Sequence, residues 1–101
     1  MDESAKAVGA FVGPRLRRIR RWHDLSQAQL AYHAEIHRTQ ISLIEGGEHM
    51  PRLDTFVKLA GSLLLPASEL LDGILWERRG ERPGRMVVVG RDADADPPAR
   101  R

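Results

Sequence analysis

The chain has 101 residues, a formal net charge of +2, 42% hydrophobic and 30% charged residues, and no cysteine. This length suits one domain with a single apolar core, and the lack of cysteine excludes disulfides and thiolate zinc sites. No apolar run reaches the roughly 20 residues of a membrane span, and the start MDESAKAVGAFV lacks the apolar segment of a signal peptide, so we expect a cytoplasmic protein without membrane contact.

Residues 1–10 are expected to form a flexible arm, followed by a first helix over roughly residues 11–23. The apolar positions of this helix recur at helical spacing: Val12, Leu16 and Ile19. Gly13-Pro14 comes early enough to lie in its first turn. Five arginines fall within seven residues: Arg15, Arg17, Arg18, Arg20 and Arg21. Such a cluster suits a phosphate-binding surface, but a solvated helix face explains it equally well.

A second and a third short helix are predicted next, joined by a tight turn. S-Q-A-Q begins the second as a capping box, in which Ser26 bonds a backbone amide and Gln29 reaches back. A break at Glu35-Ile36 separates it from the third helix, roughly residues 37–45. Gly46-Gly47 ends the third helix because glycine adopts the left-handed conformation without a Cβ clash.

Two more helices complete the predicted bundle. The fourth follows Pro51-Arg52 and ends before Pro66, and the fifth is ASELLDGI, residues 67–74. Their core positions are Leu53, Phe56, Ala60, Leu63, Leu70, Leu71 and Ile74.

The sequence changes character after Trp76. ERRGERPG is charged and contains glycine, which is typical of a linker. MVVVG, residues 86–90, is a β-branched run that predicts one short strand. A helical bundle offers no partner for a lone strand, so it would pair with its twin in a dimer, bind another protein or stay unpaired. Residues 91–101 are polar, contain proline and are expected to be disordered.

Enzyme motifs are missing from this sequence. A metal-binding pair of histidines four residues apart needs both side chains on one helical face. His33 and His37 have this spacing, but the predicted turn between them places them on different helices. There is no H-E-x-x-H, P-loop or G-x-S-x-G pattern. We therefore expect no catalysis, no metal and no cofactor.

The spacing of the polar residues suits DNA binding instead. In a helix-turn-helix the second helix enters the major groove with its first residues at the base edges. Arg38 can make a bidentate contact with guanine, and Thr39 and Gln40 can meet thymine methyls or adenine edges. The alternative is that residues 37–43 form only the wet face of a bundle helix.

Residues 12–74 resemble the lambda-repressor-like, Cro-type (XRE) helix-turn-helix family. The resemblance is carried by L-S-Q-A-Q-L-A, I-H-R-T-Q-I-S-L-I-E-G-G, P-R-L-D-T-F-V-K-L-A and A-S-E-L-L. A-Y-H-A-E-I-H-R-T-Q-I-S is similar to controller proteins of restriction–modification systems, and E-L-L-D-G-I-x-W to actinobacterial members. The resemblance implies an all-α, five-helix lambda-repressor-like DNA-binding domain over residues 11–75, with a short C-terminal β-strand extension.

The resemblance also implies roles for individual residues. Arg38, Thr39 and Ser42 take base-reading positions, with Gln40 and Leu43 on the flank of the same surface. The implied phosphate contacts are Gln27, Arg17 and Arg52. Arg20 and Glu45 fall where the family often has a partly buried ion pair that orients the reading helix.

Three residues depart from the family pattern. Glu35 and Leu64 stand where the family usually has glycine, and His37 replaces a small capping residue. A left-handed Glu35 would store roughly 1 kcal/mol of strain. Glu35, Glu45 and Glu48 bring negative charge near the reading surface, so one copy alone should bind DNA only modestly.

We therefore expect a transcriptional regulator, acting as a repressor, that binds an inverted repeat in double-stranded DNA as a homodimer. Residues 76–90 would reinforce the dimer or hold a protein partner. The alternative is the antitoxin of a toxin–antitoxin pair, in which this extension grips the toxin.

Overall fold

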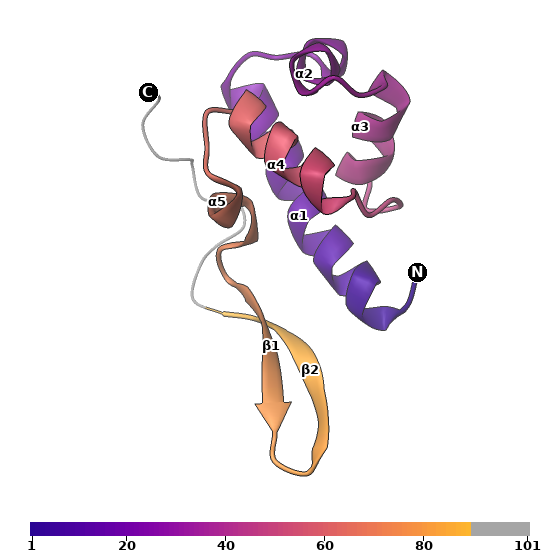
Figure 1. Cartoon of the computed structure of the whole chain (residues 1–101), viewed down its shortest axis with the longest axis vertical. Helices are drawn as coiled ribbons and strands as arrows, with labels where there is room; N and C mark the ends of the chain where they lie inside the picture. The colour runs from indigo at the N-terminus through magenta and orange to yellow at the C-terminus, as the bar shows by residue number, and fades with distance from the viewer. Residues whose placement is uncertain (90–101) are drawn as a thin grey trace.

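The computed structural model describes residues 1–89, which form five helices and a two-stranded sheet (Figure 1). The elements in chain order are α1 (Glu3–Trp22), α2 (Gln27–Ala34), α3 (Arg38–Glu45), α4 (Leu53–Ser62), α5 (Ala67–Leu71), β1 (Ile74–Arg79) and β2 (Arg82–Val88). The disorder expected for residues 91–101 concerns residues outside the described part of the chain. No helix within residues 1–89 is long and apolar enough to cross a membrane.

The first helix begins eight residues earlier than the sequence predicts. Asp2 is its N-cap, and its Oδ1 accepts a hydrogen bond from the Ala5 N–H at 2.8 Å. Residues 3–10 are therefore helical, and the expected flexible arm is wrong for them. Pro14 lies inside the helix rather than in its first turn, where it removes one helical hydrogen bond.

The C-terminal extension is a β-hairpin, not the predicted linker and lone strand. β1 pairs with β2 in antiparallel register, with Ile74 opposite Val88 and Trp76 opposite Met86. The Val89 N–H donates to the Gly73 carbonyl at 2.7 Å and closes the open end. Residues 86–88 of the β-branched run pair with residues 74–76, at the end of the predicted fifth helix and just before the predicted linker. The predicted linker itself supplies most of the rest of both strands and the turn, and the fold is a helical domain with a hairpin rather than all-α.

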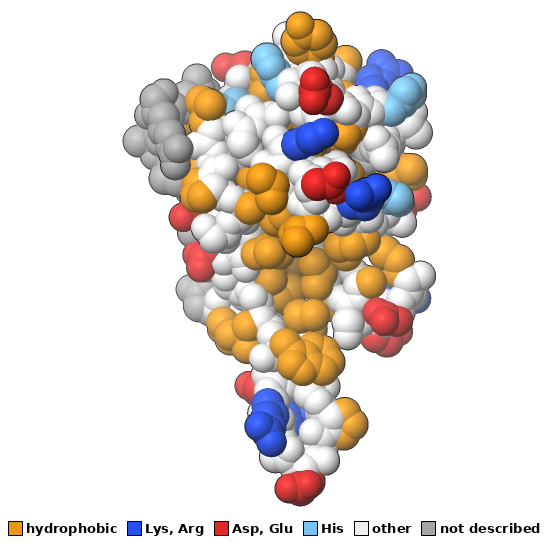
Figure 2. Space-filling view, viewed as in Figure 1, with side chains coloured by type: hydrophobic (Ala, Val, Ile, Leu, Met, Phe, Trp, Pro, Cys, Tyr) orange, Lys and Arg blue, Asp and Glu red, His pale blue; other side chains and the backbone are white. Residues whose placement is uncertain are grey.

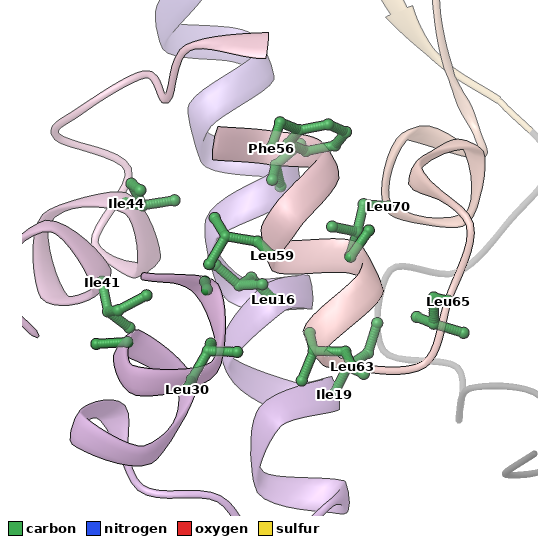
Figure 3. Close-up of a cluster of buried hydrophobic side chains, with 14 of the residues drawn as sticks. Leu16, Ile19, Leu30, Ile41, Ile44, Phe56, Leu59, Leu63, Leu65 and Leu70 are labelled. Atoms are coloured by element: carbon green, nitrogen blue, oxygen red, sulfur yellow. The ribbon is translucent and has the colours of Figure 1, made fainter. Parts of the chain in front are cut away.

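The hydrophobic core lies among the helices, whereas other hydrophobic side chains stay exposed on the face shown in Figure 2. Six core side chains have essentially no exposed surface: Leu16, Leu30, Ile41, Leu59, Leu63 and Leu70 (Figure 3). They come from all five helices, so each helix contributes burial at roughly 1.5–3 kcal/mol per large side chain. α2 and α3 are held at one end of the molecule and the hairpin extends from the other (Figure 1).

A close approach of backbones joins α1 to the end of α3. A Cβ added at Gly13 would lie 2.7 Å from the carbonyl oxygens of both Ile44 and Glu45. Such a separation is too short for any side chain, so glycine is required here. Gly13 therefore sets how closely α3 lies on α1.

Candidate nucleic-acid interface

The turn between α2 and α3 contains one strained residue. Ser26 Oγ accepts from the Gln29 N–H at 3.0 Å, and the Gln29 side chain accepts from the Ser26 N–H at 2.8 Å, as the capping box predicts. At the other end of α2, Glu35 adopts the left-handed conformation with φ 58° and ψ 42°. Leu64 has φ 61°, so both positions where the family has glycine keep the glycine-like backbone.

α3 begins with a second capping box, which is not evident from the sequence because its cap residue is a histidine. The Thr39 N–H donates to Nδ1 of His37 at 3.1 Å, and the His37 N–H donates to Oε1 of Gln40 at 3.3 Å. His37 thus replaces the usual hydroxyl cap with a ring nitrogen. Gln40 is engaged at the cap through its carbonyl oxygen, which leaves its amide N–H groups for another contact.

The polar face of α3 points to solvent. Arg38, Thr39 and Ser42 are exposed, and Leu43 is exposed at their edge, whereas Gln40 is half-buried. The buried positions of this helix are Ile41, Ile44 and Glu45. The structure therefore presents a guanidinium and two hydroxyls together on one exposed helix face, with an apolar side chain beside them.

A buried ion pair fixes this helix on α1. Arg20 Nε lies 2.6 Å from Glu45 Oε2 and Nη2 lies 3.0 Å from Oε1, and the two side chains are 8% and 3% exposed. Arg20 Nη1 also donates to the Leu25 carbonyl at 2.7 Å. This bidentate contact is the pair that the resemblance implied, and it connects α1, the α1–α2 turn and the last turn of α3.

Gln27 adds the start of α2 to the same network. Its Nε2 donates to Glu45 Oε1 at 3.2 Å. This bond uses one of the two amide hydrogens of Gln27. Because the Glu45 carboxylate is buried, the bond also fixes the direction of the second amide hydrogen. The predicted phosphate contact is thereby attached to the helix that carries the predicted base contacts.

The five arginines of α1 divide between two environments. Arg17, Arg18 and Arg21 line a surface depression together with Pro14, Trp22 and Glu45. Arg15 and Arg20 are buried instead. The cluster is therefore neither a phosphate-binding surface nor a solvated helix face over all five residues. Only the three exposed arginines can contact an external phosphate.

The comparisons with known proteins match this architecture. A family model described as "Helix-turn-helix domain" matches residues 12–71. The chain belongs to the helix-turn-helix domain family. Within that family it is a regulator of the lambda-repressor-like, Cro type, related to restriction–modification controller proteins.

Individual helix-turn-helix relatives cover the helices but not the whole chain. The control protein C.BamHI of Bacillus amyloliquefaciens is 38% identical over 66 residues, which are 64% of this chain and 82% of that protein. The restriction–modification controller protein C.AhdI of Aeromonas hydrophila is 33% identical, with a TM-score of 0.62 over 63% of this chain and 97% of its own. The DNA-binding domain of the P22 c2 repressor is 27% identical, with a TM-score of 0.59 over 61% of this chain and 82% of its own.

Arg15 connects the helix-turn-helix domain to the root of the hairpin. Its side chain lies 4.4 Å over the Phe11 ring, and Nη1 donates to the carbonyls of Asp72 at 2.5 Å and Glu69 at 3.4 Å. These carbonyls belong to the C-terminal end of α5, which a cation stabilises. The sequence signal was Phe11, one helical turn before Arg15, because a buried Phe11 places Arg15 on the inward face.

The last predicted phosphate contact lies at the start of α4. Arg52 is the N-cap residue of α4, is exposed, and its Nε lies 3.3 Å from Asp54 Oδ1. An exposed pair of this kind contributes little stability and leaves the guanidinium accessible. Within residues 1–89, no group of three or more His, Cys, Asp or Glu side chains could hold a metal ion.

Proposed function

We propose that this protein is a sequence-specific DNA-binding transcriptional regulator that binds an inverted repeat as a homodimer. The observation that carries the proposal is the exposed polar face of α3, held on α1 and α2 by the buried contacts of Glu45. The names of its relatives, a control protein, a restriction–modification controller and a DNA-binding domain, support the same function.

Base reading is assigned to the exposed face of α3. Arg38 would donate to O6 and N7 of a guanine, and Thr39 and Ser42 would contact neighbouring base edges. Leu43 would contact a thymine methyl, and Gln40 would use its amide N–H groups, since its carbonyl oxygen caps the helix. A fixed backbone supports discrimination because a misplaced donor loses the bidentate geometry.

Phosphate binding is assigned to three positions around that helix. Gln27 would use the amide hydrogen that does not bind Glu45, and Arg17 and Arg52 would contribute charge from α1 and the start of α4. Each neutralised phosphate releases condensed counterions, so affinity should fall steeply as salt concentration rises. In a dimer, two α3 helices about 34 Å apart would enter successive major grooves, and occupation of a promoter would repress transcription.

Selection of bound sequences from a random DNA library tests this function. The expected product is an inverted repeat, and Arg38→Ala should lose about 1–3 kcal/mol on it together with the preference at one base. Arg17→Ala should reduce the salt slope of binding and keep the base preference. Lys58→Ala, which removes an exposed cation from α4, is the matched control and should change neither. Recovery of no preferred sequence would refute base reading.

A second candidate, an antitoxin, is favoured by the hairpin, which lies outside residues 12–71 and exposes Trp76 and Val88. In that function the helix-turn-helix would regulate its own operon and the hairpin would bind a toxin. Co-expression with the protein encoded by the neighbouring gene tests it, because an antitoxin should co-purify in fixed stoichiometry and suppress that protein's toxicity.

A further inference from the structure

The exposed hydrophobic side chains gather on α4, α5 and the hairpin. Figure 2 shows them as a band that runs over the helices toward the hairpin. Its members are between 38% and 78% exposed: Leu53, Val57, Leu71, Trp76 and Val88. A contiguous apolar surface of this kind, unlike scattered single residues, is typical of an interaction site.

The hairpin contributes one apolar face to this band. Its register places Ile74, Trp76, Met86 and Val88 on the same side, since side chains alternate along each strand. Ile74 packs against the helical core, and the Trp76 indole lies over Gly84, where any Cβ would overlap it. The opposite side carries Leu75 and Val87 next to the Glu77–Arg85 ion pair at 3.0 Å. The hairpin therefore has an apolar side that begins at the core, whereas its other side mixes apolar and charged residues.

The helical part carries an apolar groove and, at the edge of the groove, a projecting side chain. The groove, of about 200 Å³, is apolar and lies between α1, the start of α4 and α5. Its main lining residues are Val8, Val12, Met50, Pro51, Phe56 and Leu71. Leu53 stands at its rim with 78% of its surface exposed. A two-fold contact uses the same patch on both copies, so it needs a recess and a projection on one surface.

Charges on the molecule are also complementary. Arg78 and Arg82 are exposed near the tip of the hairpin, and neither has an ion-pair partner among the described residues. The exposed Glu81 lies in the turn between them, so the tip keeps an excess of positive charge. Asp2 and Glu3 are exposed at the start of α1. In Figure 1 the start of α1 lies on the half of the molecule that carries the hairpin, level with the root of the hairpin, and the tip extends beyond it. A second copy of this chain therefore offers an acidic segment to each basic hairpin tip.

We propose that the hairpin is an arm through which a second copy of this chain docks. The apolar side of each arm, with Trp76, Met86 and Val88, covers the groove of the other copy, and the arm's basic tip meets the other copy's acidic helix start. This arrangement rests on the proposed function, which requires two copies, and assigns the dimer contact to a segment outside the family match. α3 contributes only the buried Ile44 to the groove, so its reading face stays uncovered.

Sedimentation equilibrium of the full chain tests the arm. Leu53→Asp and Val88→Asp each put a charge into the contact, and each should raise the dimer dissociation constant at least about tenfold. Leu53 is so exposed that its replacement should leave the helical circular dichroism unchanged. Leu64→Asn is the control, because Leu64 is 46% exposed outside the band and asparagine accepts its left-handed backbone. An unchanged dissociation constant in both aspartate variants overturns the proposal.

A charge exchange tests the identity of the occupant. Arg82→Glu and Glu3→Arg should each weaken the dimer several-fold, and the double variant should recover affinity because the pair is restored with reversed signs. No effect from either single change would rule out this contact between copies and favour a different protein on the arm.

The failure of the arm is distinguishable from the failure of the proposed function. A chain that dimerises and protects an inverted repeat on DNA, but whose dimer is not weakened by Leu53→Asp or Val88→Asp, refutes the arm and leaves the proposed function intact. A chain that forms the dimer but selects no DNA sequence refutes the function and leaves the arm intact.

Discussion

At the scale of single residues, the turn of the helix-turn-helix contains a strained backbone. Glu35 keeps φ near 58° although it has a Cβ, and the left-handed conformation costs a side-chain-bearing residue roughly 1–2 kcal/mol. Its carboxylate gains little in return, because the contact with Lys58 is 3.9 Å long and both side chains are exposed. The geometry of the turn is thus maintained by its neighbours rather than by Glu35 itself.

Replacing Glu35 with glycine should therefore stabilise the protein. We expect the free energy of unfolding to rise by up to about 1 kcal/mol, since relief of the strain exceeds the entropy that glycine adds to the unfolded chain. Urea denaturation followed by circular dichroism measures the change. Glu35→Ala is the control, because it removes the carboxylate and keeps the strain. Equal stability of the glycine and alanine variants would contradict this explanation.

At the scale of helices, the position of α3 depends on a buried ion pair. Glu45→Leu leaves the Arg20 guanidinium buried without its carboxylate, which should cost about 3–5 kcal/mol of stability. The double variant Arg20→Met, Glu45→Leu removes both charges and should recover most of that loss. Denaturation of the two single variants and the double variant measures the coupling. Additive losses would show that the two side chains do not stabilise each other.

The helices with local signals were predictable from the sequence. Ser26 and Gln29 begin α2, Gly46-Gly47 follows α3 and Pro66 separates α4 from α5. The hairpin was not predictable in this way, because β1 is half charged and forms only through pairing with β2. Strand pairing is a contact between segments, and hydrophobic periodicity in one segment does not report it.

The candidate site was predictable where it depends on local sequence signals and not where it depends on contacts between distant segments. The exposed positions of α3 follow from helical periodicity, and the family resemblance supplied the Arg20–Glu45 pair. The spacing from Phe11 indicates that Arg15 points inward, but its hydrogen bonds go to the carbonyls of α5, some 55 residues away along the chain. The Gln40 side chain could either cap the helix or point to solvent, and the structure shows that it accepts a hydrogen bond from the His37 N–H. Neither contact follows from residue type and spacing.

At the scale of the whole molecule, the close approach of α1 and α3 should be sensitive to a single methyl group. Gly13→Ala forces the helices apart, because the new Cβ would meet two backbone carbonyls, and we expect a loss of about 1–3 kcal/mol. DNA affinity, measured by fluorescence anisotropy below the melting temperature, should fall as well. Gly61→Ala is the control: a Cβ there has nothing within 4 Å, so helix propensity should raise stability slightly. Equal effects of the two changes would contradict the packing explanation.

The two inward arginines of α1 have a joint consequence for the spacing of an operator. Arg20 holds the end of α3, and Arg15 holds the end of α5 from which the hairpin departs. The two residues are five positions apart on one helix, or about 7.5 Å of rise. In the proposed dimer joined by the hairpins, this short length of α1 would be one of the connections that set the distance between the two α3 helices; the packing of α2, α4 and α5 would be the other. Deleting one residue between them would turn Arg20 by about 100° relative to Arg15 around the helix axis. In the proposed dimer, the number of base pairs between half-sites would therefore depend on α1 as well as on the helix that contacts the bases.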